Sequence, residues 1–180
     1  MQGSKLLVVL VLLICALEPS AEMANAAHGE SRTQNANPLV GVWRFESEID
    51  TKDEKVIATI SASEKHGFIV YTRDMFVTAL IMPSGRRWTL DSATREELVA
   101  SADDGTAYAG RYEVNSATHT VSHILGVSLE PAYEGQRLVR HFELQDDVLS
   151  LSGTYSSNGQ TYHFTLRLQK VPSDGSSRSD

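Results

Sequence analysis

Residues 136–170 read QRLVRHFELQDDVLSLSGTYSSNGQTYHFTLRLQK and contain the clearest secondary-structure pattern in the chain. Apolar and polar residues alternate along three runs, which is typical of β-strands that bury one face. These runs cover residues 136–144, 147–155 and 160–171. Two short joints separate them, Asp146-Asp147 and Asn158-Gly159, and Asn-Gly is a strong signal for a two-residue hairpin turn. Joints this short predict antiparallel neighbours.

The same pattern recurs upstream, where further strands are predicted near 39–49, 56–62, 67–73, 75–82, 110–115 and 118–128. Eight or nine antiparallel strands without prolines to blunt an edge favour closure, because a closed barrel leaves no free edge for aggregation. We therefore expect an all-β fold, an up-and-down antiparallel β-barrel, with a two-sheet sandwich as the alternative. A barrel of eight strands holds either packed side chains or one small ligand.

One segment interrupts the strands. Residues 91–109 contain few β-formers, and Thr94 followed by Glu97 has the spacing of a capping box. We predict a short inserted helix that ends near Gly105. Its apolar stripe is narrow and consists of Leu98, Val99 and Ala102. Such a helix either covers one mouth of the barrel or packs on its outer wall.

The N-terminus has the pattern of a cleaved secretory signal over residues 1–26. Lys5 supplies a positive charge, twelve apolar residues follow from Leu6 to Leu17, and Ala24-Asn25-Ala26 offers a cleavage site. A membrane span needs roughly 20 apolar residues, so a retained anchor is the weaker alternative. Lipid attachment at Cys15 is disfavoured because the bulky Ile14 precedes it.

Cleavage would remove Cys15, the only cysteine of the chain, and with it any possibility of a disulfide. Residues 27–37 are polar and aperiodic and are predicted to be a flexible leader. One domain is expected over 38–171, followed by a disordered tail over 172–180. A periplasmic or secreted protein fits these features.

Charge and missing motifs exclude several function classes. The chain has 16 basic and 23 acidic residues, a net charge of −7, which argues against a nucleic-acid partner. It has no phosphate-binding loop, no dinucleotide fingerprint and no nucleophile elbow, so no cofactor is expected. His119 and His123 would lie about 13 Å apart on a regular strand, and no metal is expected. Without a sustained amphipathic helix, no stable membrane insertion is expected after cleavage.

The alternation sorts side chains between the inside and the outside of the barrel. In the last strand the inner face consists of Tyr162, Phe164, Leu166 and Leu168. In the first strand Trp43 and Phe45 share a face. Lys170 continues the inner face of the last strand, and its ammonium group is expected to lie over Trp43 as a cation–π contact.

Polar residues on these apolar faces are the candidate ligand-binding groups. Arg140 lies on the face of Leu138 and Phe142, where a guanidinium must be paired or face a wet cavity. It either pairs with Glu113 or Glu130 or contacts a ligand. His123 is the second candidate, as a core histidine or a polar cavity group.

The predicted strands carry three further polar groups, two tyrosines and one pair of carboxylates. Tyr71 and Tyr112 are added as hydrogen-bonding partners, although the alternation leaves either face open to both. Glu46 and Glu48, two residues apart on a strand, form a solvent-exposed face or, alternatively, an acid/base pair.

Several stretches of the sequence together form the pattern of one protein family. The first strand carries Gly41-x-Trp43, and the other matching pieces are residues 67–72, 108–114, 120–123, 128–131, Gly135, 140–144 and 149–151. In this order and spacing the chain resembles the bacterial and fungal family of lipocalin-like domains, and Gly41-x-Trp43 resembles the glycine–tryptophan pair of the lipocalin first strand. The resemblance implies a small barrel that holds an apolar or amphipathic molecule, and it aligns the family's histidine with His123 and its arginine with Arg140.

Three functions remain open from the sequence. The first is binding of a small hydrophobic or amphipathic molecule, with Arg140 on an anionic head group and His123, Tyr112 and Tyr71 beside it. The second is a cofactor-independent isomerase, cyclase or lyase with His123 as acid or base. The third is a filled barrel with a structural role.

Overall fold

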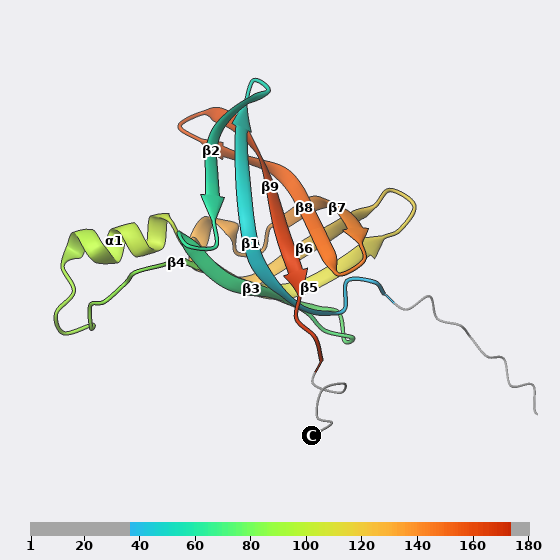
Figure 1. Cartoon of the computed structure of the whole chain (residues 1–180), viewed down its shortest axis with the longest axis horizontal. Coiled ribbons are helices and arrows are strands. Elements are labelled where there is room, and N and C mark those ends of the chain that lie inside the picture. The colour runs from blue at the N-terminus through green and yellow to red at the C-terminus, as the bar shows by residue number, and fades with distance from the viewer. Residues whose placement is uncertain (1–36, 174–180) are drawn as a thin grey trace, which may run out of the picture. The chain divides into compact units, whose positions relative to one another are not determined.

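The computed structural model describes residues 37–173 and consists almost entirely of antiparallel strands (Figure 1). The strands are β1 (Gly41–Lys52), β2 (Lys55–Ser61), β3 (Lys65–Tyr71), β4 (Phe76–Pro83), β5 (Thr106–Asn115), β6 (Thr120–Ser128), β7 (Arg137–Gln145), β8 (Val148–Ser157) and β9 (Gln160–Lys170). A helix α1 (Arg95–Asp103) and a single 3₁₀ turn η1 (Pro131–Tyr133) interrupt them. The predicted signal sequence, most of the leader and most of the tail lie outside the described residues.

The sheet closes on itself. Its strand order is β2-β1-β3-β4-β5-β6-β7-β8-β9, and β9 also pairs with β1. One edge of β1 therefore pairs with β9, while the other pairs with β3 over residues 41–44 and with β2 over residues 47–52. The result is a closed eight-stranded barrel plus the extra strand β2. This confirms the predicted all-β barrel and excludes the sandwich.

Local turn chemistry explains the meander. Asn158 and Gly159 both have positive φ, 51° and 71°, and join β8 to β9 as a two-residue hairpin. Turns with two positive φ angles match the right-handed twist of the strands that they connect, and Asn-Gly adopts them readily. The last two strands are therefore brought together by their own sequence.

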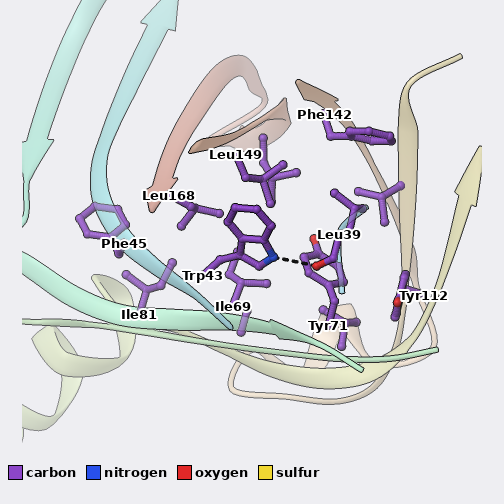
Figure 2. Close-up of a cluster of buried hydrophobic side chains, with 14 residues drawn as sticks. Leu39, Trp43, Phe45, Ile69, Tyr71, Ile81, Tyr112, Phe142, Leu149 and Leu168 are labelled. Atoms are coloured by element: carbon purple, nitrogen blue, oxygen red, sulfur yellow. Dashed lines mark hydrogen bonds between the residues drawn. The ribbon is translucent and has the colours of Figure 1, made fainter. Parts of the chain in front are cut away.

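One end of the barrel, which we call the Trp43 end, is packed with apolar side chains (Figure 2). Leu39 precedes β1 and is fully buried there, and the indole Nε1 of Trp43 donates a hydrogen bond of 2.7 Å to its carbonyl oxygen. Phe45 is also buried, as the alternation predicts. The Lys170 Nζ lies 5.2 Å from the centroid of the Trp43 ring, which confirms the predicted cation–π contact.

Asn37, just before β1, makes two hydrogen bonds at this end. Its side-chain oxygen accepts a hydrogen bond from the Leu39 backbone N–H, and its Nδ2 donates to the hydroxyl of Tyr112 at 2.7 Å.

The helix forms as predicted but takes neither of the predicted positions. Both capping-box bonds are present, from Glu97 N to Thr94 Oγ1 and from Thr94 N to Glu97 Oε2. However, α1 lies to one side of the barrel and none of its residues is buried (Figure 1). Leu98 and Val99 remain 42% and 48% exposed. Local capping determines where the helix begins, whereas too narrow an apolar stripe gives it nothing to pack with.

A bulge in β1 corrects the prediction for Glu46 and Glu48. The β1–β9 register passes from Phe45 to Ser47, so Glu46 is an extra residue and the alternation shifts by one. Glu46 stays outside and pairs with Arg44, whereas Glu48 turns inward and pairs with Lys65. The two carboxylates form neither a shared solvent face nor an acid/base pair.

Candidate functional site

A hydrogen-bonded chain of three side chains lies on the inner face of the barrel. His123 on β6 is fully buried, and its Nε2 lies 2.8 Å from the hydroxyl of Tyr71 on β3. Its Nδ1 lies 2.8 Å from the hydroxyl of Tyr108 on β5. Both ring nitrogens of the imidazole are thus engaged by tyrosines from two different strands.

The imidazole of His123 is neutral. Burial, and to a smaller extent the nearby positive charge of Arg140, lower its pKa to about 3. Burial also raises the pKa of Tyr108 to about 12 and that of Tyr71 well above the usual value. All three groups are therefore uncharged at neutral pH.

Counting protons across this chain leaves one hydroxyl proton free. A neutral imidazole has one N–H, so it donates to one tyrosine and accepts from the other. Tyr71 is 1% exposed, and a hydroxyl proton without an acceptor there would be a buried unsatisfied donor. The favoured arrangement therefore has Tyr71 donating to His123 and His123 donating to Tyr108. The proton of the hydroxyl of Tyr108, a residue that is only partly buried, then points away from His123.

Arg140 lies beside this chain on the inner face of β7. Its guanidinium carbon is 4.9 Å from the centroid of the Phe164 ring, and its Nη1 donates to the Val139 carbonyl at 3.2 Å. Burial lowers the pKa of Arg140, and electrostatic interactions with Tyr108, Tyr71 and Tyr133 act against that effect. Arg140 nevertheless remains charged, because arginine does not deprotonate in proteins.

Arg140 forms an ion pair with neither Glu113 nor Glu130. Glu113 is engaged on the outside of the barrel by Arg137, whose Nη1 lies 2.7 Å from its Oε2. Within residues 37–173 no carboxylate, Glu130 included, lies within 4.0 Å of the Arg140 guanidinium. Apart from the bond to Val139, its N–H groups have no hydrogen-bond partner among residues 37–173.

A glycine makes room for this guanidinium. A Cβ at Gly153 on β8 would lie 3.1 Å from the Arg140 Cδ and 3.0 Å from the Phe164 ring. Any larger residue would push one of the two side chains from its place. Gly153 follows the buried Leu149 and Leu151 on the inner face of the same strand.

Of the four predicted ligand-binding residues, the structure brings three together. Arg140, His123 and Tyr71 share the cluster. The Tyr112 ring packs edge-on against Tyr71 at 4.9 Å, but its hydroxyl donates to the Thr72 carbonyl at the Trp43 end. Its oxygen is not directed toward Arg140.

Sequence reasoning missed Tyr108. The strand was predicted to begin at 110, whereas β5 begins at Thr106. The signal was present, because Tyr108, Gly110 and Tyr112 continue one alternation. A register shift between Ala109 and Gly110 lies within that stretch.

A separate open groove of about 480 Å³ lies between α1 and residues 83–92. It shares no residue with the cluster inside the barrel. Among the described residues, no group of three or more His, Cys, Asp or Glu side chains is placed to hold a metal ion. No helix of this part of the chain is long and apolar enough to cross a membrane.

Two solved structures and one family model are similar to this chain. Among solved structures, the chain is similar to apocrustacyanin C2, with 10% identity and a TM-score of 0.35 over 78% of this chain and 64% of the other. It is also similar to the siderocalin Ex-FABP, with 8% identity and a TM-score of 0.31 over 74% of this chain and 70% of the other. No curated protein matches the sequence. Residues 40–171 match the lipocalin-like domain, and the chain belongs to that family.

Proposed function

We propose that the barrel binds a small amphipathic molecule whose acceptor-rich or anionic head group contacts Arg140 and Tyr108. The observation that carries this proposal is that two donor groups on the inner face of the barrel keep hydrogens that the described residues do not bond. The Arg140 guanidinium has no carboxylate partner among residues 37–173, and the Tyr108 hydroxyl proton is left free by the bonds of His123. Charge-assisted hydrogen bonds to a carboxylate, sulfonate or phosphate would satisfy both groups.

The rest of the ligand would lie against apolar side chains. Phe164 under the guanidinium and the half-buried Leu138 and Leu166 line the interior next to Arg140. The family of lipocalin-like domains typically binds small hydrophobic ligands, which agrees with this environment. A few polar groups in a largely apolar, preformed site are typical of small-molecule binding.

The geometry favours binding over catalysis by His123. A general base must be able to take a proton near the operating pH, and the pKa of His123 lies at about 3. Both of its ring nitrogens are already engaged by tyrosines. We assign His123 the role of holding the two hydroxyls in place, so that Tyr108 donates toward the ligand.

We further propose that the protein acts in the periplasm or outside the cell, on the basis of the signal-like residues 1–26. Intact mass measurement of the protein from its native host tests this proposal. A chain that begins at Ala27 is expected, and a full-length chain in the cytoplasm would contradict it.

A fluorescent fatty acid with a neutral reporter, 11-(dansylamino)undecanoic acid, tests the head-group proposal. Fluorescence titration should show saturable binding to the wild-type protein. Arg140→Ala should raise the Kd at least tenfold, because a charge-assisted hydrogen bond contributes about 1.5–3 kcal/mol. Arg137→Ala is the matched control, since Arg137 is an arginine on the outer face of the same strand.

Two results would overturn the proposal. One is the absence of saturable binding to the wild-type protein. The other is a Kd in Arg140→Ala that equals the Kd in Arg137→Ala. Circular dichroism of both variants establishes that each retains the barrel.

A further inference from the structure

A second polar group lies inside the barrel, on strands other than those that carry His123 and Arg140. We call it the acidic wall, and its members are Glu48 and Asp50 on β1, Lys65 on β3 and Tyr155 on β8. The bulge at Glu46 turns both carboxylates inward, and Asp50 is only 9% exposed. No part of the head-group site proposed above uses these residues.

Asp50 is an incompletely bonded carboxylate. Its Oδ2 accepts a long hydrogen bond of 3.3 Å from the Tyr155 hydroxyl. Its Oδ1 is buried and has no hydrogen-bond partner among the described residues. Buried carboxylate oxygens in folded proteins are nearly always bonded, so this oxygen lacks a donor that residues 37–173 do not supply.

The charges of the acidic wall also leave Asp50 without a partner. The Lys65 Nζ lies 3.4 Å from the Glu48 Oε2 and balances one carboxylate, which leaves Asp50 as a net negative charge on the acidic wall. Burial raises the pKa of Glu48 in spite of Lys65, and the charge of Asp50 raises it too. The acidic wall therefore carries a net negative charge.

The charge of Arg140 does not fill this deficit. Asp50 is the strand neighbour of Phe164 in the β1–β9 pairing, and the guanidinium of Arg140 lies over the ring of that same phenylalanine. Yet no carboxylate oxygen of the described residues approaches Arg140 within 4.0 Å. Arg140 and Asp50 therefore both lie on inner faces of the barrel without an ion-pair partner among the described residues. Isolated buried charges are costly, and each becomes favourable only with a partner.

We infer that the ligand carries an amine as well as an acidic group, with the ammonium bound by Asp50 and the acid bound by Arg140. This inference rests on the proposed function and adds to it the class of ligand: a zwitterionic amphiphile. A primary ammonium has three donors, enough for the free Asp50 Oδ1 and for the Glu48 carboxylate. A divalent metal fits less well, because the described residues offer no third carboxylate, histidine or cysteine at this place.

Matched competitors test the inference. Straight-chain ω-amino carboxylic acids of six, eight and twelve carbons are compared with plain carboxylic acids of the same lengths, as competitors of the dansyl fatty acid. In the wild-type protein at least one ω-amino carboxylic acid should compete roughly tenfold better than the plain carboxylic acid of the same length. In Asp50→Asn this advantage should disappear, while the plain acids bind as before.

Asp50→Asn is expected to keep the fold. Asparagine has nearly the same shape as aspartate, keeps an acceptor for Tyr155 and removes a buried charge, so the thermal midpoint should not fall. Glu48→Gln is a second variant on the same wall and should reduce the advantage several-fold. Glu46→Gln is the control, because the same change on the outer face of the strand should alter nothing.

The outcomes separate the two proposals. The inference is overturned, while the head-group proposal stands, if no ω-amino carboxylic acid competes better than the plain acid of the same length. It is also overturned if the advantage of the ω-amino acid survives in Asp50→Asn. If plain acids fail to compete at all, or if they compete equally well in Arg140→Ala, the proposed function fails instead.

Discussion

The buried imidazole of His123 makes the stability of the barrel depend on pH in a way that His123→Gln should remove. In the unfolded chain this imidazole has a pKa near 6.5, whereas in the folded barrel its pKa is about 3. Between these two values the unfolded state binds a proton that the folded state does not. Folding stability therefore rises with pH in this window and is lost as the pH falls from 6.5 toward 3.

The size of the effect follows from the same two values. Each pH unit inside the window changes the free energy of unfolding by about 1.4 kcal/mol per proton. Because the unfolded imidazole is only half protonated at pH 6.5, the loss between pH 7 and pH 5 is about 2 kcal/mol. Over the whole window it approaches about 5 kcal/mol, a large share of the stability of a domain of this size.

Urea unfolding of the wild type and of His123→Gln at pH 5, 6 and 7 measures this contribution. Glutamine keeps one donor and one acceptor for the two tyrosines but does not titrate in this range. Taking the difference between the two proteins at each pH removes the titration of all other groups. The wild type should lose about 2 kcal/mol more than the variant between pH 7 and pH 5. A difference independent of pH would refute the assignment of His123 as a buried neutral group.

Two further predictions concern packing. Trp43→Phe removes the indole donor that bonds the Leu39 carbonyl at 2.7 Å, and urea unfolding should show a loss of about 2–3 kcal/mol; a loss under about 0.5 kcal/mol would contradict the buried bond. Gly67→Ala places a Cβ 1.9 Å from the backbone oxygen of Leu80, so thermal unfolding should show a loss above about 3 kcal/mol or no folded protein. The control Gly126→Ala meets nothing closer than 3.7 Å and should stay within about 1 kcal/mol of the wild type, and equal effects at both glycines would argue against the close β3–β4 approach.

Much of the barrel could be predicted from alternation, because a regular strand leaves each side chain only two directions. Trp43, Phe45 and Phe164 are buried as the pattern indicates, and His123 and Arg140 face inward as expected. The same argument correctly marked Arg140 as a charge without an obvious reason to be inside. The Phe164 ring under its guanidinium lies on another strand, so sequence spacing could not identify that contact.

The pattern failed wherever a strand gains a residue. A bulge shifts the alternation by one without changing the composition of the strand, so the inward turn of Glu48 and Asp50 is invisible in a single sequence. Tyr108 was missed for a different reason, because its strand was predicted to begin at residue 110 and begins at Thr106. The capping box identified the helix because it is a local signal, whereas the position of the helix depends on contacts that it does not make.

The pairing of Trp43 with Lys170 has a consequence for how the chain reaches its native state. The barrel closes where the first strand, β1, pairs with the last strand, β9. Because these strands lie at opposite ends of the domain, their pairing closes the longest loop in the domain and costs the most chain entropy. Contacts of such long sequence separation form slowly. Until the Asn158-Gly159 hairpin brings β9 into place, β8 and β1 both expose a free edge. A chain shortened before residue 160 is therefore an open, aggregation-prone sheet that lacks Phe164, and not a smaller binding protein.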